Sequence, residues 1–222
     1  MSRVEEKNAA RRAVSREKIL SAATALFARK GIAGTGVQEI ADMADLSVGM
    51  LYRHFKTKED IFEALLEKAM ENMNSFTAFL ENEMLSSADM IKIAACGILE
   101  NINKDNEYAQ FQKLLARASD DVASSSWSMP EPMLEIQQGF LDKITRLIER
   151  GQSEGTFRQG CAKSMTQLFL AIQQGLCSWK LSMGDSYASP SPEMLTAFLL
   201  KDEHNVYEFT SADFSTDSSI NE

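Results

Sequence analysis

The chain has 222 residues, of which 44% are apolar and 25% charged, and its formal net charge is −9. This length suits one globular domain, or a small domain joined to a larger one. No apolar run approaches the roughly 20 residues of a membrane-spanning helix. The basic residues near the start of the chain precede no apolar core of a secretory signal. We therefore expect a cytoplasmic protein.

The side chains that most often build metal sites and catalytic triads are scarce. Only two histidines, His54 and His204, and three widely spaced cysteines, Cys96, Cys161 and Cys177, occur. No Cys-x-x-Cys pair is present to hold zinc, and an odd number of cysteines does not suit a disulfide framework. We expect no catalytic residues, no metal site and no cofactor. We interpret the cysteines as small buried residues in preference to redox sensors.

Charge is distributed unevenly along the chain. Residues 1–60 contain 11 Lys/Arg and 8 Asp/Glu, a net charge of +3, whereas residues 61–222 contain 12 and 24, a net charge of −12. A basic end on an acidic body indicates that only the N-terminal part meets a polyanion such as nucleic acid. The alternative is that solvated charges are scattered and the small positive excess has no function.

The N-terminal quarter is predicted to contain several helices. Residues 1–14 are polar and charged without an apolar period, which predicts a flexible basic arm. From Ser15, a suitable helix N-cap, apolar residues recur at three- and four-residue spacing until Gly31 ends the helix. Two short helices at 37–44 and 47–54 follow, and Thr57 caps a longer one.

The remainder is also predicted to be helical, and no stretch has the two-residue alternation of a strand. Amphipathic helices are expected at 88–103, 107–118, 133–150, 162–183 and 191–201, with a loop at 120–132. The helix at 133–150 should end at Gly151. Beyond residue 201 the chain is acidic and poor in apolar side chains, which predicts disorder.

The two short helices have the spacing of a helix-turn-helix, in which the second helix enters the major groove and the first fixes its angle. Five apolar residues can pack inward against Leu26 and Phe27: Ile40, Ala41, Ala44, Leu46 and Leu51. Four others can then face outward: Ser47, Val48, Met50 and Arg53. Gly49 has no side chain and permits a close approach to the DNA backbone. Any short helix pair could meet these conditions, so the motif needs further support.

That support is a resemblance over residues 16–65. The run from Ile40 to Ile61, IADMADLSVGMLYRHFKTKEDI, resembles the DNA-binding segment of the TetR (tetracycline repressor-type) family. The preceding pattern Ile19-Leu20-x-x-Ala23-x-x-Leu26-Phe27-x-x-x-Gly31 resembles that family's first helix. Further along, Gly151-x-x-x-Gly155-x-Phe157-Arg158 resembles a turn late in the family's ligand-binding part. The rest of the chain is similar only in general layout.

The resemblance implies roles for individual residues. Tyr52 and Lys58 resemble the tyrosine and lysine that contact DNA phosphates, the lysine beside a helix N-terminus. Ser47, Val48, Met50 and Arg53 are candidate readers of bases or nearby phosphates. Arg53 suits a guanine contact because it can form a fork to O6 and N7, although a phosphate contact is equally compatible. His54 is expected to pack or cap more than to read bases, and Phe55 is expected in the core.

Two positions depart from the family pattern. Asp45 stands where the family usually has glycine, and aspartate tolerates the left-handed conformation better than most residues, so the turn should survive. Gly36 stands where the family often has threonine. Glycine donates no hydroxyl to phosphate, so that contact either shifts to Thr35 or is lost.

The resemblance also implies an all-α fold in four parts: a basic arm at 1–14, a helix-turn-helix domain at 15–62, a helical ligand-binding and dimerisation domain at 63–202, and an acidic tail at 203–222. The apolar helix at 162–183 must be buried on several sides, by the protein's own body or by a partner, and two recognition helices one DNA turn apart would read a palindrome. We therefore expect a homodimer that binds double-stranded DNA and has no membrane role.

The effector of such a protein is expected to be apolar or amphipathic. Met and Phe side chains could line an adaptable pocket or simply form the core: Met84, Met90, Phe111, Met129, Met133 and Phe140, with Trp127 in the loop. The acidic excess suits either a cationic ligand or a solvated acidic surface. No ligand-binding residue can be named from these patterns.

Two functional hypotheses remain. The first is a dimeric, ligand-responsive transcriptional repressor. The second is a helical small-molecule-binding protein or enzyme whose N-terminal helices only resemble a DNA reader. The scarcity of histidine argues against catalysis, so the first hypothesis is preferred.

Overall fold

The computed structural model describes residues 3–81, 84–124 and 131–201. Over these ranges the chain is helical, and the β-type pairing found there is a single bridge between Phe157 and Leu200. The helices in chain order are α1 (Arg3–Lys30), α2 (Val37–Met43), α3 (Val48–Tyr52), α4 (Lys58–Leu80), α5 (Ser87–Lys104), α6 (Glu107–Ser124), α7 (Glu131–Ser153), α8 (Ala162–Met183), the 3-10 helix η1 (Gly184–Ser186) and α9 (Pro192–Thr196). The predicted all-α class is confirmed.

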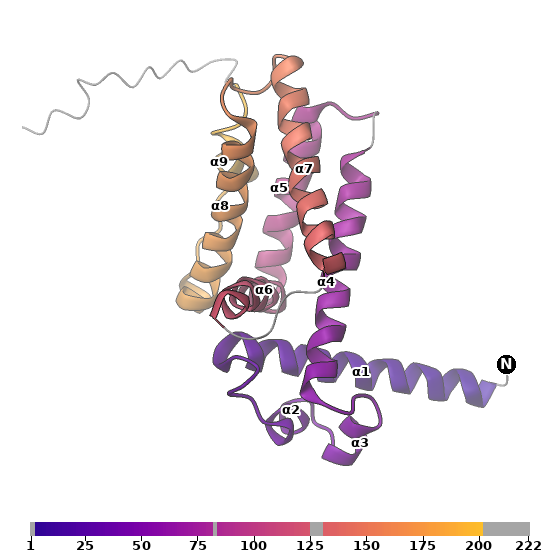
Figure 1. Ribbon diagram of the computed structural model, residues 1–222. Coiled ribbons are helices and arrows are strands. Elements are labelled where there is room, and N and C mark those ends of the chain that lie inside the picture. Colours follow the sequence, from indigo (N-terminus) through magenta and orange to yellow (C-terminus); the bar gives the residue numbers. More distant parts are fainter. Residues whose placement is uncertain (1–2, 82–83, 125–130, 202–222) are drawn as a thin grey trace, which may run out of the picture.

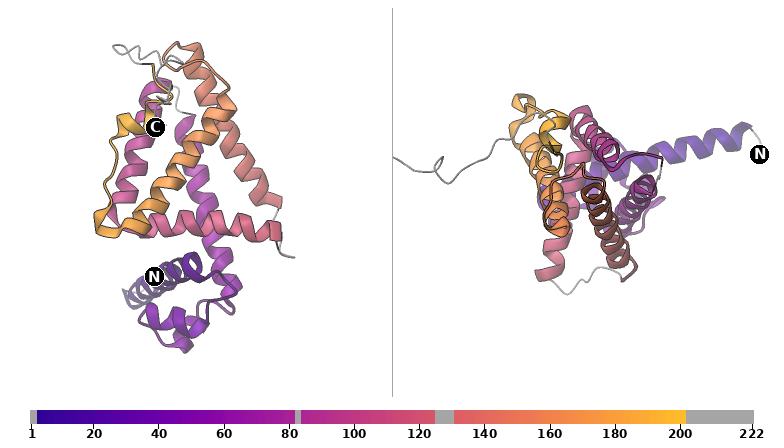
Figure 2. Two further views of the ribbon diagram at one scale, coloured as in Figure 1. Left: turned by 90° about the vertical axis from the view of Figure 1, so that its left-hand side faces the viewer. Right: turned by 90° about the horizontal axis from the view of Figure 1, so that it is seen from above.

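The helices form two stacked parts (Figures 1 and 2). The lower part contains α1, α2, α3 and the start of α4, and the upper part contains α5 to α9. Helix α4 runs from the lower part into the upper one. Each part has its own hydrophobic core, and Leu114 of α6 is buried in the lower core. Helices α4 and α6 therefore join the two parts.

Helix α1 begins at Arg3, far before the predicted start at Ser15, and projects beyond the rest of the lower part (Figure 1). The prediction of a flexible arm is therefore wrong for residues 3–14. Residues 5–13 consist mainly of good helix formers, with Glu5 and Glu6 at the positive end of the helix dipole. Apolar periodicity did not reveal this segment because residues 5–14 are exposed and have no apolar face to bury. The Ser15 hydroxyl is not a cap, since it donates to the carbonyl oxygen of Arg11 at 3.0 Å.

Several other boundaries also differ from the prediction. Helix α6 extends to Ser124 and α7 begins at Glu131, so the predicted loop is shorter than 120–132. Pro132 lies in the first turn of α7, where proline is tolerated. Helix α7 continues through Gly151. Helix α9 ends early because residues 199–201 pair with residues 156–158 through backbone hydrogen bonds.

The three cysteines are free, but only Cys177 is buried. The expectation of buried cysteines is therefore wrong for Cys96 and Cys161. Within the described part of the chain, no helix is long and apolar enough to cross a membrane. Trp127, Met129, the side chain of Met133 and the tail at 203–222 lie outside the described residues.

Candidate nucleic-acid interface

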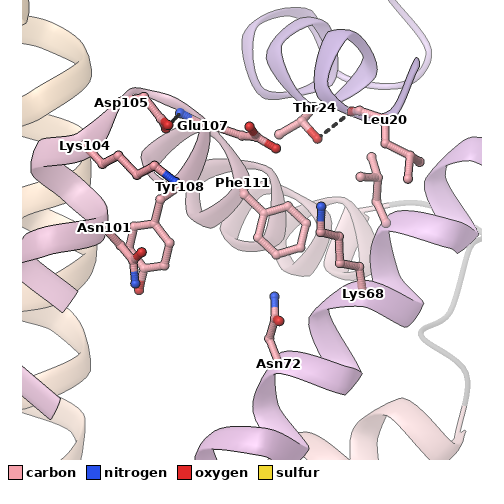
Figure 3. Close-up of a pocket in the computed structure, with 11 residues that line it drawn as sticks. Leu20, Thr24, Lys68, Asn72, Asn101, Lys104, Asp105, Glu107, Tyr108 and Phe111 are labelled. Carbon is pink, nitrogen blue, oxygen red and sulfur yellow. Dashed lines mark hydrogen bonds between the residues drawn. The ribbon is translucent and has the colours of Figure 1, made fainter. Parts of the chain in front are cut away.

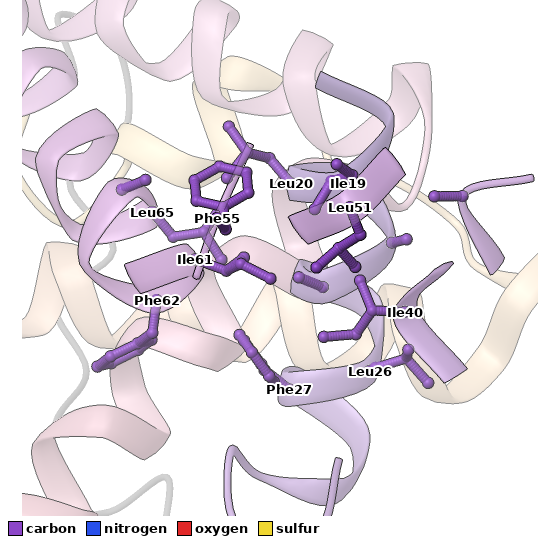
Figure 4. Close-up of a cluster of buried hydrophobic side chains, with 14 of the residues drawn as sticks. Ile19, Leu20, Leu26, Phe27, Ile40, Leu51, Phe55, Ile61, Phe62 and Leu65 are labelled. Carbon is purple, nitrogen blue, oxygen red and sulfur yellow. The ribbon is translucent and has the colours of Figure 1, made fainter. Parts of the chain in front are cut away.

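The core beneath the helix-turn-helix forms as predicted (Figure 4). The five inward-facing residues pack against Leu26 and Phe27, all but Leu46 fully buried. The Phe27 and Phe62 rings meet edge to face with centroids 6.3 Å apart, so α4 is fixed against α1. Phe55 is buried in the same cluster. This packing sets the position of α3 relative to the rest of the lower part.

The turn between α2 and α3 fixes the orientation of α3 relative to α2. Asp45 adopts the left-handed conformation with φ 56°, as expected for an aspartate in a glycine position. The Leu46 N–H donates to the carbonyl oxygen of Ala41 at 3.0 Å and closes the turn. Ser47 then caps α3, because its hydroxyl accepts a hydrogen bond from the Met50 N–H at 3.2 Å.

Helix α3 and its ends expose two of the four predicted base-reading residues, Ser47 and Arg53, whereas the outward-facing position predicted for Val48 is wrong. Ser47, Gly49, Tyr52 and Arg53 are exposed, with Tyr52 retaining 51% of its accessible surface. Arg53 is the C-cap residue of α3. Met50 is half-buried, and Val48 packs against the core. The structure thus exposes four DNA-binding candidates close together in the chain: a serine, a glycine, a tyrosine and an arginine.

Two predicted phosphate ligands are placed differently. Thr35 is buried, and its hydroxyl donates to the carbonyl oxygen of Gly31 at 2.7 Å, so this hydroxyl does not take over the contact missing at Gly36. Gly36 is the exposed N-cap of α2, and its N–H donates to Glu39 Oε2 at 3.1 Å. Lys58 is half-buried, and its ammonium donates to the carbonyl oxygens of Ile32 (2.9 Å) and Thr35 (3.2 Å). These partners hold the turn after α1.

Two arginines of α1 lie beside the recognition helix, which sequence reasoning missed. The Arg16 guanidinium lies over the Phe55 ring, 5.3 Å from its centroid. His54 is half-buried, and its pKa lies below the ordinary histidine value, chiefly through burial and also through the charges of Arg12 and Arg16. The i, i+4 spacing of the two arginines was the available signal, but it required knowing that the segment is helical.

The upper part contains a partly open cavity of about 630 Å³ that is lined by helices α4 to α8. Of the pocket candidates from the sequence, Phe111 and Phe140 line it, whereas Met90 is buried in the core and Met84 is exposed. Several amide side chains that sequence reasoning did not single out also line it: Asn72, Asn101, Gln112, Gln137, Gln173 and Gln174. The described residues contain no group of three or more His, Cys, Asp or Glu that could hold a metal ion.

Comparison with known proteins identifies the class of protein in which this helix-turn-helix occurs. The family model described as "Bacterial regulatory proteins, tetR family" matches residues 19–65. The chain is 26% identical over 189 residues to the uncharacterized HTH-type transcriptional regulator YvkB of Bacillus subtilis, covering 83% of this chain and 95% of that protein. Residues 19–65 therefore have the DNA-binding segment of the TetR family.

Two further similarities extend over the upper part. The HTH-type transcriptional repressor NicS of Pseudomonas putida is 23% identical over 158 residues, covering 71% of this chain and 72% of that protein. The crystal structure of the MbdR regulator from Azoarcus sp. CIB superposes with a TM-score of 0.62 at 26% identity, covering 82% of this chain and 93% of that one. With these relatives and its TetR-type DNA-binding segment, the chain is a DNA-binding transcriptional regulator, and the enzyme hypothesis is set aside.

Proposed function

We propose that this chain is a ligand-responsive repressor that binds a palindromic operator as a homodimer. The observation that carries the proposal is the exposure of Tyr52 and Arg53 at the end of a recognition helix whose core and turn are firmly packed. The TetR-type segment supports DNA binding, and the relative NicS is named as a repressor. The palindromic operator, the homodimer and the response to a ligand are what we propose beyond these findings.

On DNA, Arg53 reads guanine in the major groove and Tyr52 contacts a phosphate. Ser47 and Gly49 lie at the N-terminal end of α3, where the helix can approach the bases closely. Arg12 and Arg16 add positive charge beside this helix. Lys56, which is exposed just before α4, replaces Lys58 as the candidate phosphate ligand. Affinity should therefore fall steeply with salt.

The proposed dimer uses one face of α8. Leu168, Trp179 and Met183 keep 47%, 61% and 44% of their accessible surface, and their spacing of 11 and 4 residues places them on one side of the helix. Half-buried Ile172 and Gly175 lie between them on the same face. An exposed apolar stripe of this kind is typical of a protein interface. Pairing through this face would place two copies of α3 on one duplex.

The proposed ligand site is the cavity of the upper part. Its volume lies within the range of small-molecule sites, about 300–1,000 Å³. Helix α6 lines this cavity with Phe111 and Leu115 and also places Leu114 in the lower core. A ligand that prefers one position of α6 would therefore shift the lower part, and with it the separation of the two recognition helices.

The decisive experiment is the selection of bound duplexes from a random DNA library with the purified full chain. A palindrome should be recovered, and its half-site spacing should be one helical turn or a multiple. Arg53→Ala should then lose preference at one base position, whereas Arg146→Ala, an exposed arginine on α7, should behave as the unmodified chain. Recovery of no preferred sequence, with or without cell extract as a source of ligand, would refute the proposal.

A further inference from the structure

The described residues that line the cavity of the upper part carry no formal charge. None of the 23 described residues that line it is Asp, Glu, Lys, Arg or His. If the lining had the composition of the whole chain, about six of them would be charged, since 25% of the chain is. Most of the lining is apolar, including five phenylalanines. The acidic excess of the body therefore lies outside the cavity, which removes the argument for a cationic ligand.

A fixed polar centre lies within this apolar lining. The Tyr108 hydroxyl accepts a hydrogen bond from Gln173 Nε2 at 2.6 Å. Burial raises the pKa of Tyr108 to about 12, partly offset by hydrogen bonding to Gln173 and Gln112, so its hydroxyl stays protonated at neutral pH. The Tyr108 proton remains for one acceptor, either Gln112 or a ligand oxygen. Polar groups placed in this way orient a ligand inside an apolar cavity.

Among the described residues, charged side chains line a smaller neighbouring pocket. This pocket, of about 190 Å³, lies next to the cavity and shares Asn72, Asn101, Tyr108 and Phe111 with it (Figure 3). Both signs of charge surround this smaller pocket: Lys68 and Lys104 with Asp105 and Glu107. Lys68 is already paired with Glu17 at 3.2 Å. This mixed arrangement selects neither an anion nor a cation.

We propose that the cavity binds an uncharged, largely aromatic molecule that carries a hydroxyl or carbonyl group directed at Tyr108 and Gln173. An ion placed in this cavity would lose part of its water and meet no opposite charge among the described lining residues, a cost that a neutral ligand avoids. The phenylalanines suit aromatic rings, and the amides can serve either a donor or an acceptor of a neutral ligand. The inference deepens the proposed function, because it names the ligand class of the same site.

The test uses three molecules of one shape that differ in charge: 4-phenylbenzyl alcohol, 4-phenylbenzoate and 4-phenylbenzylammonium. Calorimetric titration of the full chain at pH 7 should show the alcohol binding at least tenfold more tightly than either ion. An ion that binds as tightly as the alcohol would overturn the inference. Failure of the alcohol to bind up to its solubility limit would overturn it as well.

Two variants locate the binding. Gly97 lines the cavity, and a Cβ added there meets nothing within 4 Å. Gly97→Leu should therefore fill part of the cavity and lower the affinity for the alcohol at least tenfold. Gly139 on α7 is equally open but does not line the cavity, so Gly139→Leu should leave the affinity unchanged. Equal affinity in both variants would place the alcohol elsewhere and overturn the inference.

A third variant tests the polar centre. Tyr108→Phe removes only the hydroxyl and should lower the affinity for the alcohol about fivefold. The affinity for 4-methylbiphenyl, which has no polar group, should not change. Calorimetry measures ligand binding in the absence of DNA, whereas the library selection measures DNA binding and uses none of these three molecules. Failure of one therefore does not imply failure of the other, and the ligand class and the repressor function are tested separately.

Discussion

The ammonium group of Lys58, at the first position of α4, donates a hydrogen bond of 2.9 Å to the carbonyl oxygen of Ile32, in the turn after α1. The same ammonium also reaches Thr35. These carbonyls follow the end of α1 and precede α2, where helix ends leave backbone acceptors without partners. Lys58 therefore joins α4 to the turn that carries α2, a structural role that its sequence position beside a helix N-terminus did not indicate.

This role predicts a loss of stability on substitution. Lys58→Met keeps most of the side-chain volume but removes the charged donor, and should lower the free energy of unfolding by about 1–3 kcal/mol. Lys56→Met removes the same charge from an exposed side chain and should change it by less than about 0.5 kcal/mol. Urea denaturation at equal protein concentration measures both. Equal stability of the two variants would contradict the role assigned to Lys58.

The two arginines beside α3 should contribute to DNA affinity without contributing to sequence choice. Replacing Arg12 and Arg16 by alanine should weaken binding to all duplexes. If each contacts one phosphate, the slope of log affinity against log salt should become shallower by about 1.8. Fluorescence anisotropy at several salt concentrations measures this slope. Alanine at Lys163 and Lys180 of α8 removes the same charge far from α3 and serves as the control; an equal loss there would show only a long-range effect.

His54 should titrate below the ordinary value near 6.5, because burial and the two arginines oppose its protonation. Below about pH 6.5 the unfolded chain then binds more protons than the folded one, so this group's contribution to stability is lost as pH falls through the folded pKa. NMR titration measures the pKa, with a His204→Asn variant to assign the signal. Replacing Arg12 and Arg16 by alanine should raise it, and a pKa above 6.5 in the unmodified chain would contradict the geometry.

Gly151 cannot accept a side chain in this packing. A Cβ there would lie 2.6 Å from the ring of Phe157, which is fully buried. Gly151→Ala should therefore lower the free energy of unfolding by about 1–3 kcal/mol. Gly139→Ala, at an open helical position, should instead raise it by up to about 1 kcal/mol. Thermal unfolding of the two variants should give shifts of opposite sign, and shifts of the same sign would refute the prediction.

The left-handed conformation of Asp45 predicts an order of stabilities at this position. Glycine adopts this conformation without a Cβ penalty, aspartate tolerates it and alanine does not, so the order should be Gly, Asp, Ala with steps of about 0.5–1 kcal/mol. Chemical denaturation of Asp45→Gly and Asp45→Ala measures the order. An Asp45→Ala variant as stable as the unmodified chain would show that the turn relaxes.

Much of the lower part could be predicted from the sequence, because its determinants are local. The inward positions of α2 and α3 follow from helical spacing, and the caps at Ser47 and Thr57 form as expected. The exposure of Tyr52 and Arg53 follows from the same phase. Residues 3–14 have no apolar face, so the spacing of apolar residues did not predict the helix that forms there.

The sequence by itself therefore determined the helices, the helix-turn-helix and the exposed face of α3, since each depends on residues within a few positions of one another. Only the tertiary structure decided that Lys58 binds the carbonyl of Ile32, that Thr35 is buried and that Arg16 covers Phe55. It alone also brought uncharged residues of α4 to α8 around one cavity. Such contacts join residues far apart in the chain, and they depend on the angles at which helices pack, which no local pattern specifies.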